Sequence, residues 1–194
     1  MSNEVFSENS YLIKKKVFKL FGESFRIYNQ QGQLNFFVQQ KAFKLKEDIR
    51  VYTGEDMKEE VLIIKARSAM DFSAIYDVYD SKTNENLGSL KRKGLKSMLK
   101  DSWTIFDADD KEIVDIQEDS MALSLLRKFV LGGLLPQTFI GRKGEEDIFT
   151  FKQKFNLFVP NMNLDFSIDK NNVLDRRVGI AAAVLLCAIE GKQN

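Results

Sequence analysis

Alternating hydrophobic and polar residues form a unit that recurs along the chain. Each copy begins with an aromatic residue, has a β-branched residue two positions later, and continues through Asn or Asp and a polar turn to a second apolar segment. A spacing of two places the aromatic and the β-branched side chains on one face of a strand, and Asn and Asp suit the turn that follows. The four predicted hairpins run from Phe25 to Leu34, from Tyr76 to Leu87, from Trp103 to Ile113 and from Phe166 to Val173.

Further strands are predicted outside these hairpins. Ile49 and Val51 alternate with polar neighbours, and Val61 to Ile64 is an apolar run of strand length. Large apolar residues share one parity from Phe149 to Val159, and Pro160 ends that run. The chain therefore consists mostly of strands.

The segment from Val178 to Ile189 breaks this pattern because it is apolar at every position. Its alanines and leucines favour a helix, and a helix without a polar side must be buried all round. Twelve helical residues rise about 18 Å, which matches strands of about 17–20 Å. A barrel of about eight strands is filled by its own side chains, so a sheet that encloses this helix needs clearly more strands. The alternative, a helix packed on one open sheet, leaves an apolar face in water.

Composition narrows the class of protein. The 194 residues include 29 Lys and Arg against 28 Asp and Glu, a balance that argues against a dedicated nucleic-acid binder. The length favours a single domain over residues 1–194, and the absence of His excludes His-based triads and His-ligated zinc. Cys187 lies in the apolar run, where a lone Cys is typically a small buried hydrophobe. No signal peptide or membrane-spanning run is evident, so a cytoplasmic location is expected.

Aromatic hairpins that close on a C-terminal apolar helix resemble the tubby-like barrel superfamily, and within it the LURP-one-related group. The superfamily also includes the tubby C-terminal domain and the phospholipid scramblases. The resemblance rests on Tyr11 to Leu45, Tyr76 to Leu90, Lys91 to Asp107 and Asp165 to Glu190. It implies an all-β fold in which a closed antiparallel barrel of about twelve strands surrounds a buried C-terminal hydrophobic helix.

The resemblance also suggests classes of function. Tubby domains bind phosphoinositide headgroups through basic residues on the barrel wall, and scramblases are calcium-regulated membrane proteins. We therefore expect a non-enzymatic binding or scaffold module, bound to anionic lipid headgroups or to a protein partner, in the cytoplasm or peripheral to a membrane. A calcium-responsive, scramblase-like protein is an alternative, although this chain stops soon after its apolar segment, at Asn194, where scramblases carry a membrane anchor.

One stretch is strongly basic. Residues 91–100 contain five cations and no acid, and cations at 142–143 or 14–16 would extend the patch if the fold brings them close. Such a patch would hold an anionic headgroup, since each cation near an anionic membrane is worth about 1 kcal/mol. The plainer interpretation is a solvated strand edge whose lysines discourage edge pairing. The predicted cationic set consists of Lys91, Arg92, Lys93, Lys96, Arg142 and Lys143.

Other chemistry has weaker support. Asp107, Asp109 and Glu118 match part of a calcium-loop register, but Lys111 and Glu112 occupy positions that need an oxygen ligand and a glycine. We expect a hairpin turn there. The acidic segment Asp165, Asp169, Asn171 and Asp175 precedes the apolar helix, where scramblases have a calcium segment, and turn chemistry explains the same residues.

Neither a cofactor nor a metal site is predicted. No Walker loop, Rossmann glycine pattern or nucleophile elbow is present, so a carboxylate-dependent enzyme is the distant alternative. A capped amphipathic helix from Met121 to Leu131 completes the predicted elements. We expect it to pack over an open end of the barrel, with a position on a membrane surface as the alternative.

Overall fold

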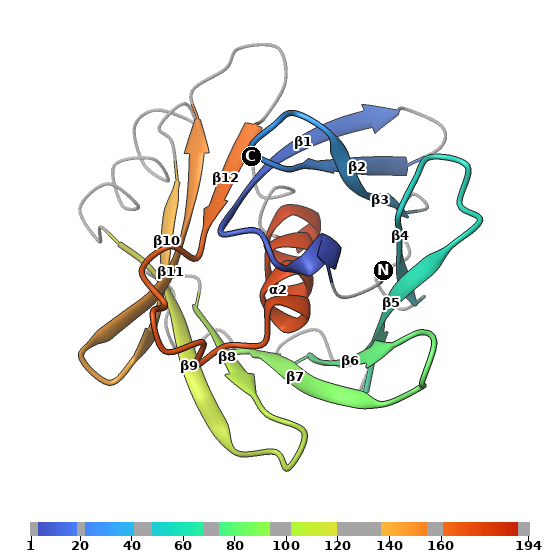
Figure 1. Ribbon diagram of the computed structural model, residues 1–194. Helices are drawn as coiled ribbons and strands as arrows, with labels where there is room; N and C mark the ends of the chain where they lie inside the picture. The colour runs from blue at the N-terminus through green and yellow to red at the C-terminus, as the bar shows by residue number, and fades with distance from the viewer. Residues whose placement is uncertain are drawn as a thin grey trace.

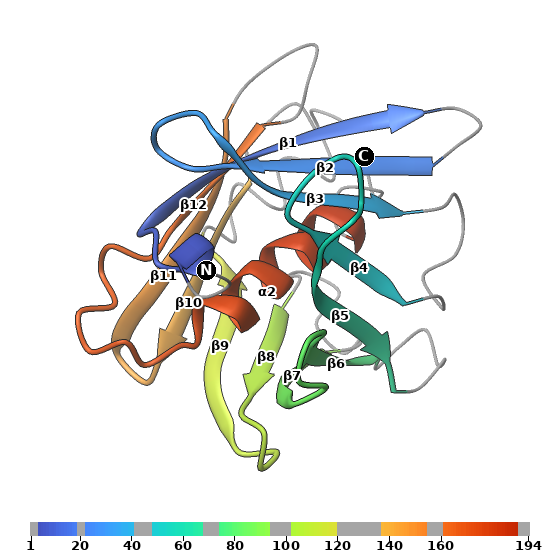
Figure 2. The same cartoon turned by 45° about the vertical axis from the view of Figure 1, so that its right-hand side comes forward.

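In the described part of the chain, a computed structural model shows a closed barrel of twelve antiparallel strands with the helix α2 (Arg176–Ile189) along its interior (Figures 1 and 2). The structure describes residues 4–18, 22–40, 48–67, 74–93, 102–119, 137–154 and 161–189. The predicted fold class is therefore confirmed, including the strand number that the resemblance implied. The predicted helix at 121–131, the strand continuation at 155–159 and Lys96 lie outside the described residues.

Each strand pairs with its neighbours in the sequence, and β1 closes the barrel against β12. A short 3-10 turn, η1 (Glu4–Phe6), precedes β1, and its Phe6 ring stacks on Phe36 at 4.8 Å between ring centroids. The strands are β1 (Ser10–Phe18), β2 (Gly22–Tyr28), β3 (Leu34–Gln40), β4 (Ile49–Tyr52), β5 (Glu60–Ala66), β6 (Ile75–Asp80), β7 (Asn86–Arg92), β8 (Ser102–Phe106), β9 (Glu112–Glu118), β10 (Thr138–Lys143), β11 (Glu146–Lys154) and β12 (Asn161–Asp165).

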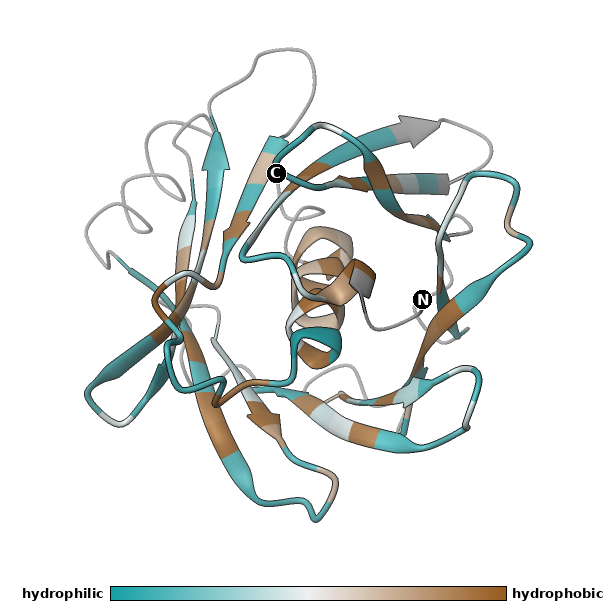
Figure 3. Cartoon of the chain, in the orientation of Figure 1, coloured by the Kyte–Doolittle hydropathy of each residue, from teal (hydrophilic) through white to brown (hydrophobic). Residues whose placement is uncertain are grey.

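Alternation along the strands builds the core. Figure 3 shows hydrophobic and hydrophilic bands succeeding one another on the strands around a helix that is apolar beyond its first turn. In β2, for example, Phe25 and Ile27 are fully buried while Arg26 between them is partly exposed. Three of the four predicted hairpins are confirmed as β2–β3, β6–β7 and β8–β9, and the predicted strands at Ile49 and Val61 are β4 and β5.

The fourth predicted hairpin, from Phe166 to Val173, is wrong. The residues before it form β12, and 166–175 is an irregular connection that leads into α2. Its Asp169 resembles a strand-ending Asp but accepts hydrogen bonds from the backbone N–H groups of Val173 (2.8 Å) and Leu174 (3.2 Å). These local bonds satisfy the backbone within the connection, so no second strand forms.

The helix α2 is buried from Val178 to Ile189, as its sequence predicts. Asp175 begins it: its carboxylate accepts a hydrogen bond from the Arg177 N–H at 2.8 Å, and its carbonyl accepts one from the Gly179 N–H at 3.0 Å. At the other end, Lys15 Nζ donates to the carbonyl oxygen of Cys187 at 3.3 Å. A cation at the carboxyl end of a helix is favourable because unsatisfied carbonyl groups gather there.

The helix α2 begins at one end of the barrel and ends at the other. The turns of the β2–β3, β4–β5, β6–β7, β8–β9 and β10–β11 hairpins share the end where α2 begins, because successive strands run in opposite directions. Arg177 of the first helical turn reaches Asp80, at the close of β6, with Nη1–Oδ2 3.1 Å. Lys15 and the carboxyl end of α2 mark the opposite end.

Candidate functional site

Lys91, Arg92 and Lys93 of the predicted cationic set lie at the end of β7, and their side chains do not share one face. Lys91 and Lys93 are exposed, while Arg92 is half-buried. Arg92 pairs in register with Trp103, whose ring is buried in the core. Arg92 therefore belongs to the inward-facing row at the edge of the barrel, and only Lys91 and Lys93 lie on the outer wall.

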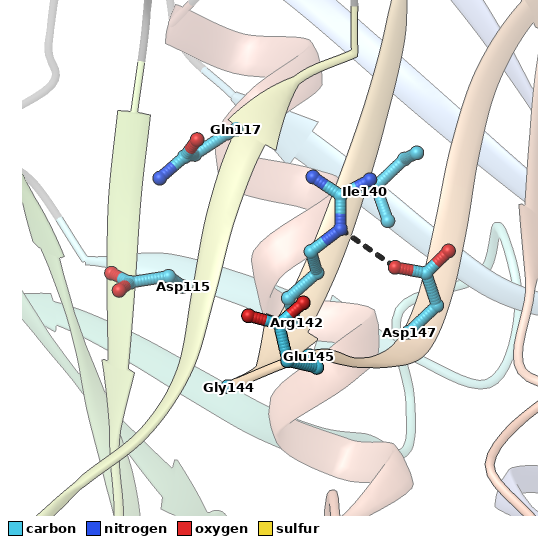
Figure 4. A pocket seen from close by; sticks show the side chains of 7 residues that line it. All are labelled: Asp115, Gln117, Ile140, Arg142, Gly144, Glu145 and Asp147. Carbon is cyan, nitrogen blue, oxygen red and sulfur yellow. Dashed lines mark hydrogen bonds and ion pairs between the residues drawn. The ribbon is translucent and has the colours of Figure 1, made fainter.

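Arg142 and Lys143 lie on β10, and the outer wall brings Arg142 near Lys93 with an acid between them. Lys93 Nζ lies 2.7 Å from an oxygen of Asp115, and Asp115 pairs in register with Arg142. Arg142 Nε in turn lies 2.7 Å from Asp147 (Figure 4). Lys143 is exposed at the neighbouring turn. Both Lys93 and Arg142 are thus already neutralised by carboxylates of the same wall.

A surface pocket of about 590 Å³ opens on this part of the wall. Figure 4 shows Arg142 between Asp115 on one side and Asp147 on the other. Burial raises the pKa of Asp115, but hydrogen bonds from Lys93 and Thr104 outweigh it and hold that pKa below its ordinary value. Asp115 is therefore ionised at neutral pH and unsuited to general-acid catalysis there. The pocket is lined by Asp115, Gln117, Ile140, Arg142, Gly144, Glu145 and Asp147.

A second basic surface lies elsewhere on the barrel, on the outside of β11, β12, β1 and β2. We call it the basic wall. The register places Lys14 of β1 opposite Asn161 of β12, and Asn161 opposite Lys154 of β11. Two strand spacings separate the two lysine Cα atoms by about 10 Å. The basic wall is defined by Lys14, Lys16, Arg26, Lys152 and Lys154.

Aromatic rings lie against two of these cations on the basic wall. Lys14 Nζ lies 4.9 Å from the centre of the Tyr28 ring, and the Arg26 guanidinium lies 5.5 Å from that of Phe37. Among the described residues, Glu55 of the β4–β5 connection reaches this surface from outside these strands, where it binds Arg26 and attracts the charge of Lys16. The other described outward-facing residues in the area spanned by the five cations are Leu12, Ser24, Tyr28, Asn161 and Asn163.

Sequence reasoning named residues 14–16 only as possible neighbours of the predicted cationic set, and it missed Lys152 and Lys154. The signal available was two lysines of one strand parity in each of two segments. Their juxtaposition depends on the pairing of β1 with β12 and of β12 with β11, which joins segments about 140 residues apart in the chain. This surface forms because the barrel closes, and no local pattern in the sequence indicates it.

Three of the acidic residues considered for calcium, Asp107, Asp165 and Asp169, bind neighbouring groups of the fold. Asp169 is fully buried and binds Arg176 Nη1 at 2.8 Å, and Asp165 accepts a hydrogen bond from the Ser167 N–H. Asp107 accepts hydrogen bonds from the N–H groups of Asp109 and Lys111 within the β8–β9 turn, which confirms the predicted hairpin turn. Within the described ranges, no group of three or more Cys, Asp or Glu residues is arranged to hold a metal ion.

The family model of LURP-one-related (LOR) proteins matches residues 34–132, just over half of the chain. The chain belongs to the LURP-one-related family. The matched segment of this LOR barrel begins at β3 and includes β9, so the four strands of the basic wall lie outside it. Neither a curated protein nor a solved structure matches the LOR chain significantly. In the part of the LOR chain that the structure describes, every helix is too short or too polar to span a bilayer.

Proposed function

We propose that this LOR barrel is a non-enzymatic binding module that attaches to anionic lipid headgroups through its basic wall. The observation that carries the proposal is the clustering of five cations, from segments distant in the sequence, on one outer surface of the barrel. The wall spans four adjacent strands, or about 15 Å at ordinary strand spacing. That width suits several lipid headgroups at once better than one small ligand.

The energetics favour weak, reversible attachment. Each Lys or Arg close to an anionic membrane contributes about 1 kcal/mol, so five contribute about 5 kcal/mol before the cost of association. Exposed charges are screened by salt over about 10 Å at ordinary ionic strength, so binding should weaken steeply as salt rises. The proposal makes the protein peripheral to a membrane, on the cytoplasmic side.

The basic wall is a better candidate than the predicted cationic set for the same ligand. Lys93 and Arg142 are bound by Asp115 and Asp147, and the pocket between them adds a third acid, Glu145. An anionic headgroup there would have to compete with carboxylates already in place. On the basic wall, the printed ion pair with a carboxylate is that of Arg26 with Glu55, which is exposed and reaches the wall from a neighbouring loop.

Sedimentation with lipid vesicles tests the proposal. The reversal Lys14→Glu/Lys154→Glu on the basic wall is compared with the matched reversal Lys91→Glu/Lys143→Glu, which changes the net charge by the same amount. At low salt we expect the wild type to pellet with phosphatidylserine-containing vesicles and not with phosphatidylcholine alone. The wall reversal should reduce binding by at least tenfold, and the matched reversal should leave it nearly unchanged.

Three results would contradict the proposal. Equal pelleting of the wild type with anionic and neutral vesicles would remove the lipid ligand and favour a protein partner. Loss of binding in the Lys91/Lys143 variant alone would move the site to the predicted cationic set. Equal loss in both variants would show that only the net charge matters. Circular dichroism of each variant confirms that the barrel has folded.

A further inference from the structure

Glu55 occupies the guanidinium of Arg26 in the geometry that a phosphate would use. Its Oε1 lies 2.8 Å from Nε, and its Oε2 lies 2.8 Å from Nη2. Two parallel bonds of this kind are the characteristic way in which Arg binds carboxylate and phosphate groups. The carboxylate therefore covers one binding edge of the only arginine that defines the basic wall.

Arg26 is held in place independently of Glu55. Its guanidinium lies over the Phe37 ring, and its Nη1 lies 3.4 Å from Ser24 Oγ. The side chain is only 23% exposed, and its backbone pairs with both β1 and β3. Removal of Glu55 would leave the donors of Arg26 aimed at the same place, ready for another oxyanion.

Glu55, in contrast, is weakly held. It lies in the connection between β4 and β5, its side chain is 51% exposed, and Arg26 donates two hydrogen bonds to it. The charge of Lys16 also attracts it. Exposed ion pairs contribute little to stability, so an incoming anion can displace Glu55 at small cost. The hydrogen bond from Arg26 holds the pKa of Glu55 below its ordinary value, so the competitor is charged at neutral pH.

We propose that Glu55 is an internal competitor for the anion-binding edge of Arg26, and that a phosphate group of the ligand displaces it on binding. The inference rests on the proposed function, because it assigns to the basic wall both the ligand chemistry, a phosphate oxyanion, and a device that lowers its affinity. Displacement also frees the charge of Arg26 for the ligand. While Glu55 is bound to Arg26, the basic wall therefore offers an anion less positive charge than it does after Glu55 has moved away.

The test compares Glu55→Gln with Glu59→Gln. Glu59 lies in the same connection, is equally exposed at 51%, and is ion-paired with Lys82 rather than with the basic wall. Both variants remove one negative charge from the same loop. We expect Glu55→Gln to bind anionic vesicles about three- to tenfold more tightly than the wild type, as loss of an exposed ion pair allows, and Glu59→Gln to bind as the wild type does. Adding Arg26→Gln to Glu55→Gln should abolish the gain.

Inorganic phosphate provides a second readout without a membrane. We expect phosphate to raise the melting temperature of Glu55→Gln more than that of the wild type or of Glu59→Gln. A phosphate response of this kind without a gain in vesicle binding supports the competitor and assigns it to a free phosphate, which would overturn the lipid proposal. Identical behaviour of Glu55→Gln and Glu59→Gln in both assays overturns the competitor, whatever the lysine reversals show.

Discussion

The Phe166 ring lies against the backbone of Gly179, so closely that a Cβ added to Gly179 would lie 2.5 Å from the ring edge. Gly179 belongs to the second turn of α2, and Phe166 follows β12 directly. Both residues are buried, and Phe166 also carries the Arg176 guanidinium at 4.6 Å from its ring centre. This contact fixes how the beginning of the helix enters the barrel.

Gly179→Ala should therefore destabilise the protein although Ala is the better helix former. Overpacking in a core costs about 1–3 kcal/mol, against a gain in helix propensity of about 1 kcal/mol. We expect a net loss of up to about 2 kcal/mol in the free energy of urea unfolding. In the double variant with Phe166→Leu the two losses should be less than additive, because the ring that causes the clash is gone. An increase in stability from Gly179→Ala alone would contradict the contact.

Lys15 and Glu23 form an ion pair at the other end of α2, with 3.0 Å between Nζ and Oε1 and side chains 7% and 13% exposed. Removing the cation leaves a nearly buried carboxylate without its counter-ion, which typically costs about 3–5 kcal/mol. We expect Lys15→Met to lower the unfolding free energy by about 3 kcal/mol. The double variant Lys15→Met/Glu23→Gln should lose less. If Lys15→Met/Glu23→Gln is less stable than Lys15→Met alone, Lys15 does not stabilise the protein through its ion pair with Glu23.

Asp80 should make stability depend on acidic pH. Burial raises the pKa of Asp80, but hydrogen bonds from the N–H groups of Lys82 and Thr83 and from Arg177 outweigh it and lower that pKa. A carboxyl group with a lowered pKa stabilises the fold above its unfolded-state pKa of about 3.9 and loses that contribution as the pH falls through the folded-state value.

Asp80→Asn should cost about 1.5–3 kcal/mol at pH 7, typical of hydrogen bonds to a charged group. The difference between wild type and variant should begin to shrink as the pH falls below about 4, where this carboxyl group becomes protonated in the unfolded chain, and should vanish below its lowered folded-state pKa. Urea unfolding at several pH values measures it. A difference that is constant with pH would show that the charge of Asp80 contributes nothing.

The thiol of Cys187 should be unreactive in the folded protein. Its side chain is buried inside the barrel, with Sγ 3.3 Å from the sulfur of Met162, and burial raises the pKa of its thiol to about 12. Thiolates are the reactive species, so we expect no reaction with Ellman's reagent at pH 8 in the folded state. One thiol per chain should react in guanidinium chloride. Rapid labelling of the folded protein would place the helix outside the barrel.

Much of the fold is predictable because it follows from burial. An apolar helix from Val178 to Ile189 has no place in water, and alternation marks the strands that enclose it. The prediction of a hairpin from Phe166 to Val173 was wrong because the same pattern of an aromatic residue, a β-branched residue and an Asp also occurs in a connection whose Asp binds the backbone. Only the structure shows that the Asp169 carboxylate is used by nearby backbone N–H groups.

The binding surface was harder to predict than the fold. The run around Lys93 is dense in charge, but its partner Asp115 lies on β9 and became evident only in the structure. The basic wall has the opposite character, since Lys14 and Lys154 are unremarkable locally and gain importance from their positions on either side of β12. Charge density along a chain predicts a surface only when the strand order is known.

A fluorescent label on the basic wall tests the central claim most directly. Because Cys187 is buried, a single introduced cysteine can be labelled selectively with an environment-sensitive dye. Asn163→Cys places the dye on the basic wall, and Gln117→Cys places it in the pocket lined by Asp115 and Arg142. With phosphatidylserine-containing vesicles we predict brighter, blue-shifted emission at position 163 and no change at position 117. A change at 117 alone, or at neither position, would contradict attachment through the basic wall.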